Sequence, residues 1–250
     1  MARRAMIDVR GLYKRFGDHE VLRGVDLAVE EGSTVVILGG SGSGKTVLMK
    51  HMIGLLKPDR GQVLVEGEDI VPLGAAELEV VRRKFGMVFQ AAALFDSMTV
   101  YENVSFPLRE HTRTSEARMR QIVREKLDIV GLHDVEEKYP ADLSGGMRKR
   151  VGLARAIVLE PKIVLYDEPT TGLDPITTEY VDEMILEAKA RLQVTSVVIS
   201  HDVASSFKVA DTVAFLSSGT IVEQGPPERM RNATHPALRQ FLRSWFEKNE

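Results

Sequence analysis

An unbroken apolar run at residues 35–38 (Val-Val-Ile-Leu) leads into a glycine-rich segment and then into a stretch with helical spacing. A strand that is apolar on both faces is typical of the interior of a parallel sheet, because helices cover both sides of such a sheet. Similar runs return at residues 163–166 and 197–199, with helical patterns between them. The sequence therefore predicts an α/β fold with a mainly parallel central sheet.

Three other regions complete the predicted organisation. Residues 1–30 contain two runs of alternating apolar and polar side chains around a turn at Gly17-Asp18, which predicts an N-terminal antiparallel β subdomain. Residues 91–160 show mostly helical spacing, and a hairpin pattern follows near the end of the chain. We expect a core formed by 1–90 and 161–225, an inserted helical subdomain at 91–160 and a tail helix at 226–250.

The glycine-rich segment matches the motif G-x-x-x-x-G-K-[ST], in the strand–loop–helix context that this motif requires. It consists of Gly39, Gly40, Ser41, Gly42, Ser43, Gly44, Lys45 and Thr46. Glycines let backbone N–H groups point at phosphate oxygens, and the helix N-terminus adds partial positive charge. We expect a P-loop NTPase core in which Lys45 approaches the β- and γ-phosphates and Thr46 binds Mg²⁺. The alternative is a glycine-rich turn that binds nothing, which the context disfavours.

Two acids, Asp167 and Glu168, stand where the buried run 163–166 ends. Adjacent carboxylates repel each other unless a cation is present, so a divalent metal is the expected partner. We expect Asp167 to hold Mg²⁺, through water, and Glu168 to point to the opposite face and activate the attacking water. The alternative is a strand end that carries surface acids.

His201 lies just after the buried run 197–199. Ligands of parallel sheets bind at the carboxyl ends of the strands, so this histidine is placed to donate a hydrogen bond to the γ-phosphate. A structural histidine is the alternative.

Ser144, Gly145 and Gly146 precede a helical run whose apolar stripe consists of Val151, Ala154, Ile157 and Val158. A serine and two glycines at a helix start can form a second anion cradle. One ATP does not need two cradles from one chain, so we infer that this one closes on the ATP of another copy in a two-fold dimer. A plain N-capped helix is the alternative.

Together these motifs resemble, in order and spacing, the ATPases of ATP-binding-cassette (ABC) transporters, over residues 7–225. The resemblance implies that Phe16 stacks on adenine and that Gln90 touches Mg²⁺ and links to the helical subdomain. It also implies that Asp174 lies in a loop that crosses the dimer. Val47 departs from the family pattern, because it replaces a hydroxyl residue that contacts the α-phosphate and leaves only its backbone N–H.

Within that family the chain resembles the ATPases of Mla/Mce-type phospholipid transporters. The stretches 94–110 and 143–150 carry the likeness, including Met147 where most of the superfamily has glutamine. The resemblance implies a homodimer on the cytoplasmic face of the inner membrane, held there by an integral membrane permease, with a possible small regulatory subunit and substrate-binding protein. The sequence leaves the cargo and the transport direction open.

The permease would dock near Leu94, Phe95 and Met98, where the family receives a cytoplasmic helix of its partner. Ordinary packing of the helical subdomain is the alternative. The tail carries Leu238, Phe241, Leu242, Trp245 and Phe246 at helical spacing. This tail could pack on its own domain, across the dimer, or on a membrane surface.

Composition narrows the choice of function. The formal net charge of −3 does not favour a nucleic-acid partner, and the absence of cysteine excludes disulfides and thiolate metal sites. The N-terminus, with Arg3 and Arg4, has no apolar run of signal-peptide length, and no stretch reaches the roughly 18–20 apolar residues that span a bilayer. We therefore expect action on a membrane only through a partner.

Other classes of protein remain as alternatives. A soluble cassette ATPase acting on nucleic acid or ribosomes usually has two cassettes or a coiled-coil insertion, and neither pattern occurs here. A binding module without chemistry would not need Lys45, Glu168 and His201, and a small-molecule phosphotransferase would have no use for the serine–glycine helix start. An ABC importer or exporter of a non-lipid substrate stays open.

Overall fold

The computed structural model describes residues 4–249 and separates into two compact units. Unit 1 comprises Met1–Arg82 and Thr195–Glu250, and unit 2 comprises Arg83–Val194. The first three residues, including Arg3 of the N-terminal pattern discussed above, lie outside the described residues, as does the last residue of the predicted tail.

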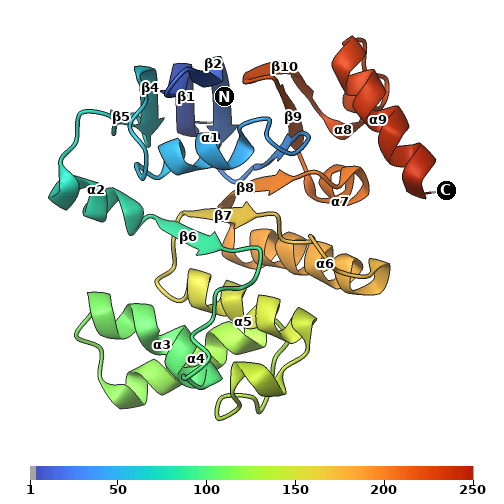
Figure 1. The fold of residues 1–250 in the computed structure, drawn as a ribbon. Helices are drawn as coiled ribbons and strands as arrows, with labels where there is room; N and C mark the ends of the chain where they lie inside the picture. The colour runs from blue at the N-terminus through green and yellow to red at the C-terminus, as the bar shows by residue number, and fades with distance from the viewer. Residues whose placement is uncertain (1–3, 250) are drawn as a thin grey trace. The chain divides into compact units, whose positions relative to one another are not determined.

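Unit 1 contains the predicted antiparallel sheet, in the strand order β2-β1-β4-β5 (Figure 1). Its strands are β1 (Ala5–Phe16), β2 (His19–Glu30), β4 (Arg60–Val65) and β5 (Glu68–Asp69). The turn between β1 and β2 falls at Gly17 and Asp18, as predicted. Gly61 on β4 has a φ of +96°, and a Cβ there would lie 2.3 Å from the carbonyl oxygen of Gly11, so the strands can approach only because this residue is glycine.

The second set of strands in unit 1, which are parallel except for β10, follows the order β10-β9-β3-β8. They are β3 (Thr34–Leu38), β8 (Thr195–Ser200), β9 (Thr212–Ser217) and β10 (Thr220–Gly225). β3 runs parallel to both β8 and β9, while β10 closes a hairpin on β9. Every residue of β3 and β8 is buried, which confirms the prediction from their two-sided apolar sequence.

Helices of unit 1 begin with α1, which directly follows the glycine-rich loop. They are α1 (Lys45–Met52), α2 (Ala75–Arg82), α7 (Val203–Val209), α8 (Pro227–Arg231) and α9 (Pro236–Asn249). On α9, Leu238 and Leu242 are buried, and the ring of Phe241 lies 5.1 Å from that of Phe215 on β9. This face of the tail helix therefore packs on its own chain, whereas Phe246 keeps 47% of its surface exposed.

Unit 2 pairs two parallel strands, β6 (Phe85–Val88) and β7 (Ile163–Asp167), and carries the other helices of the described residues. These are α3 (Val100–His111), α4 (Glu116–Ile129), the 3₁₀ helix η1 (Pro140–Asp142), α5 (Gly145–Ile157) and α6 (Pro175–Leu192). The stripe predicted on α5 is buried, and α5 packs against α3, α4, α6 and β6. Unit 2 extends beyond residues 91–160 because it includes β6, β7 and α6, and the boundary of the predicted subdomain stays a prediction.

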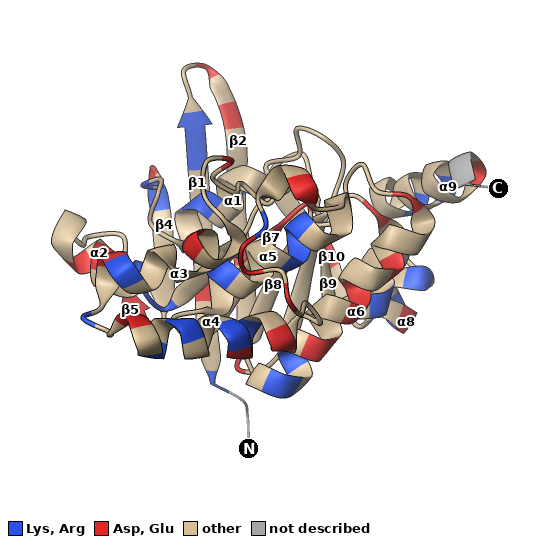
Figure 2. Cartoon of the chain, turned by 90° about the horizontal axis from the view of Figure 1, so that it is seen from below, with Lys and Arg blue, Asp and Glu red and all other residues tan. Residues whose placement is uncertain are grey.

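Basic and acidic side chains are mixed along α4 (Figure 2). Arg118 and Arg120 lie 3.7 and 3.6 Å from Glu125 and Glu116 respectively, so α4 carries exposed ion pairs and not a stripe of one sign. Within residues 4–249, no helix has both the length and the apolar character needed to cross a membrane.

Candidate functional site

The loop of residues 39–44 joins β3 to α1 and leaves the start of that helix open to an anion. Gly44 occupies the N-cap position with a left-handed φ of 106°, which a glycine adopts without steric cost. The helix has no side-chain cap and no acidic residue in its first turn. The positive end of α1 is therefore not neutralised by the helix itself.

Lys45 folds back over this loop, and its Nζ donates to the carbonyl oxygens of Gly39 (2.8 Å) and Gly40 (3.1 Å). These bonds keep a charged ammonium group beside the loop although the side chain is largely buried. Gly39 is required for close approach, since a Cβ there would lie 2.4 Å from the carbonyl oxygen of Leu216. Thr46, the predicted Mg²⁺ ligand, is exposed, and Val47 is half-buried.

Two other predicted residues of unit 1 lie at strand ends. Phe16 ends β1 with 47% of its surface exposed, and the Lys14 Nζ lies 5.5 Å from its ring centroid. An exposed ring of this kind can stack on a base. His201 follows β8 and is exposed, and the backbone beside it is fixed because Asp202 caps α7 by accepting from the Ser205 N–H at 3.1 Å.

In unit 2, the two acids follow one another at the end of β7. Asp167 is the last residue of the strand, and Glu168 has a left-handed φ of 50°. The chain has already left the strand at Glu168, so strand alternation does not determine where this side chain points, contrary to the reasoning from sequence. Its carboxylate accepts a hydrogen bond from the Thr171 hydroxyl at 3.1 Å, and its carbonyl accepts from the Thr171 N–H at 3.3 Å. A closed turn therefore carries the predicted water-activating residue.

Gln90 is exposed just beyond β6, and the loop after it has an unusual backbone. Ala92 and Ala93 both have left-handed φ values, 60° and 47°, which cost roughly 1–2 kcal/mol for each residue with a Cβ. Arg155 on α5 donates to both of their carbonyl oxygens at 2.7 Å and so holds this conformation. The only sequence signal of Arg155 is that it is a basic residue within an otherwise apolar helix stretch, so this contact could not be predicted.

Ser144 is the N-cap of α5, and its Oγ accepts from the Met147 N–H at 3.2 Å. The alternative of a plain N-cap is therefore correct as a description of the local structure. It does not exclude anion binding, because the serine hydroxyl can still donate its proton and the first N–H groups of a helix have no partner within it. Gly146 packs closely on α6, since a Cβ there would lie 3.3 Å from the Thr177 Cγ2.

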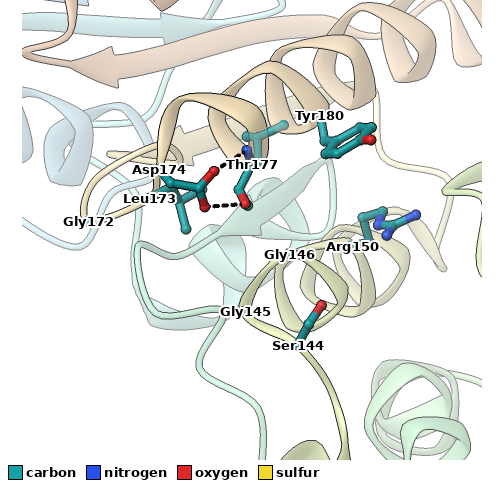
Figure 3. Close-up of a pocket in the computed structure, with 10 residues that line it drawn as sticks. Ser144, Gly145, Gly146, Arg150, Gly172, Leu173, Asp174, Thr177 and Tyr180 are labelled. Carbon is teal, nitrogen blue, oxygen red and sulfur yellow. Dashed lines mark hydrogen bonds between the residues drawn. The ribbon is translucent and has the colours of Figure 1, made fainter.

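A hollow of about 300 Å³ separates the start of α5 from the start of α6 (Figure 3). Its lining includes Ser144, Gly145, Gly146, Arg150, Leu173, Asp174 and Tyr180. The structure thus brings together the serine–glycine tip and the aspartate loop, which the sequence had placed about thirty residues apart. Both belong to unit 2.

Asp174 is the N-cap of α6 and is held by its own helix. Its carboxylate accepts from the N–H groups of Ile176 (3.1 Å) and Thr177 (3.0 Å), and from the Thr177 hydroxyl (2.5 Å). The hydroxyl bond of Thr177, together with these N–H bonds, lowers the pKa of Asp174 below its ordinary value. The Asp174 carboxylate is therefore charged at every pH above its ordinary pKa. The hydrogen bonds by which it caps α6 are lost only as the pH falls through the lowered pKa. A role of Asp174 across a dimer stays a prediction.

The oxygen donors named for Mg²⁺ suit that cation in kind. Thr46 and Gln90 are exposed and offer a hydroxyl and an amide oxygen, and Asp167 offers a carboxylate. Among residues 4–249 no group of three or more His, Cys, Asp or Glu side chains could hold a metal. Oxygen donors of these kinds suit Mg²⁺, and the prediction that Thr46 of unit 1 shares one ion with Gln90 and Asp167 of unit 2 stays a prediction.

The comparison with protein families matches residues 22–171, which is more than half of the chain, to the family described as "ABC transporter". The chain belongs to the ABC transporter ATPase family. The matched residues include the P-loop, the serine–glycine helix start and the Asp167-Glu168 pair, and the match confirms the resemblance to the family, while the roles of these residues stay predictions.

Curated relatives match nearly all of the cassette. It is 46% identical over 236 residues to the "probable ribonucleotide transport ATP-binding protein mkl" of Mycobacterium leprae, covering 94% of this chain and 68% of that protein. It is 39% identical over 237 residues to the "intermembrane phospholipid transport system ATP-binding protein MlaF" of Escherichia coli, covering 95% of this chain and 88% of that protein. MlaF of Haemophilus influenzae is also 39% identical, with 95% and 90% covered.

Solved structures agree on the fold. The cassette superposes on cbiO1 of Clostridium perfringens, part of the ABC transporter complex cbiONQ, with a TM-score of 0.85 and 29% identity, covering 95% of this chain and 98% of that one. It superposes on the ATP-binding cassette MJ0796, a dimer in a post-hydrolysis state bound to ADP and Pi, with a TM-score of 0.80 and 31% identity, covering 89% and 99%. The chain is thus the ATP-hydrolysing subunit of an ABC transporter.

Proposed function

We propose that the cassette powers phospholipid transport of the Mla/Mce type in a bacterial envelope. The observation that carries this proposal is the match to MlaF, which covers nearly the whole length of both chains. The name printed for mkl instead mentions ribonucleotide transport. A non-lipid cargo is therefore the second candidate.

Each predicted site residue receives a role in this proposal. The P-loop and Lys45 bind the phosphates, and Phe16 stacks on the base. Thr46, Gln90 and Asp167 hold Mg²⁺, which would neutralise phosphate charge when bound. Glu168 accepts a proton from the attacking water or orients it. The remaining contacts to nucleotide come from His201, Val47, Ser144, Gly145, Gly146 and Asp174.

The proposal also includes a homodimer in which each copy offers the start of α5 to the nucleotide of the other. The dimeric MJ0796 cassette supports this arrangement as a precedent in the family. The hollow beside Ser144 and Asp174 supports it from this chain, because a phosphate-binding helix start opens there.

An integral membrane permease is the partner that holds the cassette at the cytoplasmic face of the membrane. Its proposed contact is the loop after β6, in which Phe95 is 43% exposed and Leu94 and Met98 are half-buried. The fully buried Asn103 fixes this loop: its Oδ1 accepts from the Phe95 N–H at 2.8 Å, and its Nδ2 lies 3.1 Å from the carbonyl oxygens of both Phe95 and Met98. A loop held this firmly presents its apolar side chains with little further ordering cost on binding.

Charged substitutions test this contact. Phe95→Glu and Met98→Glu should abolish co-purification with the permease and its stimulation of ATPase activity, because a charge would be buried at the interface. Val80→Glu is the control, since Val80 is 62% exposed on α2 and lies outside this loop. If the loop variants co-purify as well as Val80→Glu does, the proposed docking surface is wrong.

The cargo is tested by reconstitution with a permease and a binding protein identified among the neighbouring reading frames. Proteoliposomes with ATP should move a fluorescent phospholipid between vesicle and binding protein, and phospholipid should stimulate hydrolysis more than ribonucleotides do. Stimulation and uptake of ribonucleotides without lipid transfer would instead favour the second candidate.

A further inference from the structure

Lys149 lies on α5, five residues after Ser144, and only 6% of it is exposed. Its Nζ donates a hydrogen bond to the carbonyl oxygen of Pro169, which directly follows Glu168. One buried contact therefore joins the helix that begins at the serine–glycine tip to the turn that carries the water-activating acid. Both ends of this contact lie in unit 2.

The turn that receives this bond is narrow and well defined. Glu168 has its left-handed φ, and the Thr171 hydroxyl holds its carboxylate at 3.1 Å. Pro169 contributes a fixed φ and no N–H group, so its carbonyl is the one backbone hydrogen-bonding group that this residue can offer. A donor on this carbonyl acts one residue from Glu168, and a displacement of the donor would move the carboxylate.

Burying the ammonium group of a lysine costs desolvation free energy. Desolvation lowers the pKa of Lys149 from its ordinary value, and an apolar side chain of similar length would avoid that cost. The chain nevertheless keeps an ammonium group there and directs it at a single turn. This supports a role for the donor itself and not only for the volume of the side chain.

We propose that Lys149 is a positioning residue for ATP hydrolysis, which ties the turn of Glu168 to the helix whose start meets the partner copy's nucleotide. Contact between the start of α5 and the partner copy's nucleotide then sets the orientation of Glu168 in the same chain. Closure of the dimer therefore orients the water-activating residue of each copy. This inference rests on the proposed dimer and on the role proposed for Glu168. Lys149 does not touch the reacting atoms.

Substitution of Lys149 by methionine removes the donor and keeps the length of the side chain. We expect Lys149→Met to lower kcat about 10-fold, because a misplaced general base loses part of its 10²–10⁴-fold effect. The Kd for Mg-ATP should stay within about 2-fold, since the P-loop is unchanged. Lys149→Arg can donate to the same carbonyl and should restore kcat to within about 3-fold of the parent.

Lys126→Met is the matched control, because Lys126 is also a buried lysine of unit 2 but pairs with Glu160, at 2.7 Å. It should leave kcat unchanged. Thermal unfolding of all variants separates a folding defect from a positioning defect. A kcat for Lys149→Met equal to that of Lys126→Met, or a loss of kcat that arginine does not restore, would overturn the inference.

Combining Lys149→Met with a second substitution, either Thr171→Val or Glu168→Gln, gives a result that general destabilisation would not produce. Thr171→Val should lower kcat by a similar factor. The kcat of the double variant Thr171→Val with Lys149→Met should lie within about 2-fold of that of either single variant, because both side chains act through one carboxylate. In Glu168→Gln, single-turnover hydrolysis should not slow further when Lys149→Met is added. Additive losses, or a further slowing without the acid, would refute positioning.

These kinetic tests are separate from the test of the dimer. If Glu168→Gln with Mg-ATP remained a single copy, the proposed pairing would fail whatever Lys149 does. If that variant formed pairs and Lys149→Met kept full kcat, only the present inference would fail.

Discussion

The starts of α1 and α5 are both predicted to bind phosphate, yet they are built differently. Gly44 begins α1 with a left-handed backbone and no side-chain cap, and Lys45 follows at once. Ser144 begins α5 with an extended backbone, and its hydroxyl already accepts from the Met147 N–H. The first N–H groups of α1 therefore lack a side-chain acceptor and depend on an added anion, beside which Lys45 places a full positive charge. At the start of α5, one N–H group already has the Ser144 hydroxyl as its acceptor.

This difference suggests separate tasks for the two helix starts. An uncapped start with a lysine can hold nucleotide in a single chain. A start that is already capped by its own serine, with glycine and not lysine as its first helical residue, should bind a phosphate only weakly by itself. It becomes useful when a second copy presents a nucleotide that is already bound. Substitutions at the start of either helix test this difference between α1 and α5, and their expected effects on binding and hydrolysis differ in size.

Lys45→Ala should have the largest effect. Removal of a charge-assisted contact to phosphate should weaken Mg-ATP binding about 100-fold and reduce hydrolysis to background. Isothermal titration and a phosphate-release assay measure both quantities. Lys50→Ala is the control, because Lys50 is exposed on the same helix, and equal binding by the two variants would contradict the role of Lys45.

Glu168→Gln should separate binding from cleavage. The amide cannot accept the proton of water, so kcat should fall at least ~10²-fold while Mg-ATP binding remains. Single-turnover hydrolysis and equilibrium binding measure the two steps, and parent-like turnover would dismiss Glu168 as the activating residue.

Ser144→Ala tests most directly whether the start of α5 acts on the nucleotide of the other copy. It should leave Mg-ATP binding to the single chain unchanged and lower kcat about 10-fold, because the lost hydroxyl matters only where the two copies meet. Ser115→Ala is the control, since Ser115 is the N-cap of α4 and makes no side-chain cap hydrogen bond. Weaker binding by the single chain would show that Ser144 acts on its own copy's nucleotide.

Phe16→Ala should have the smallest effect of the four. Loss of one stacked ring should weaken Mg-ATP binding about 5-fold at unchanged kcat, and Phe16→Tyr should bind like the parent. A change in kcat without a change in binding would place the ring elsewhere.

Much of the fold could be predicted from local sequence. The buried strands β3, β7 and β8, the turn at Gly17 and the P-loop each depend on residues close together in the chain, and each was found where expected. The family was also predictable, since three motifs in order are more specific than any one of them.

What the sequence did not predict depends on side chains that reach distant backbone. Arg155 holds the carbonyls of Ala92 and Ala93, and Lys149 holds that of Pro169, across 62 or 63 and 20 residues respectively. A long flexible side chain leaves no periodic signal of its target, and a left-handed φ at alanine or glutamate contradicts local preference. Both of these long side chains lie on α5, and both hold backbone that departs from local preference.

The central claim is that nucleotide joins two copies, each completing the site of the other with the start of its α5. The most direct test is the mass of Glu168→Gln in solution at saturating Mg-ATP, by light scattering or sedimentation, with the permease added if needed. The account predicts twice the mass of one chain with Mg-ATP, the mass of one chain without it, and loss of the pair in the double variant with Ser144→Ala. A single copy under all of these conditions would contradict it.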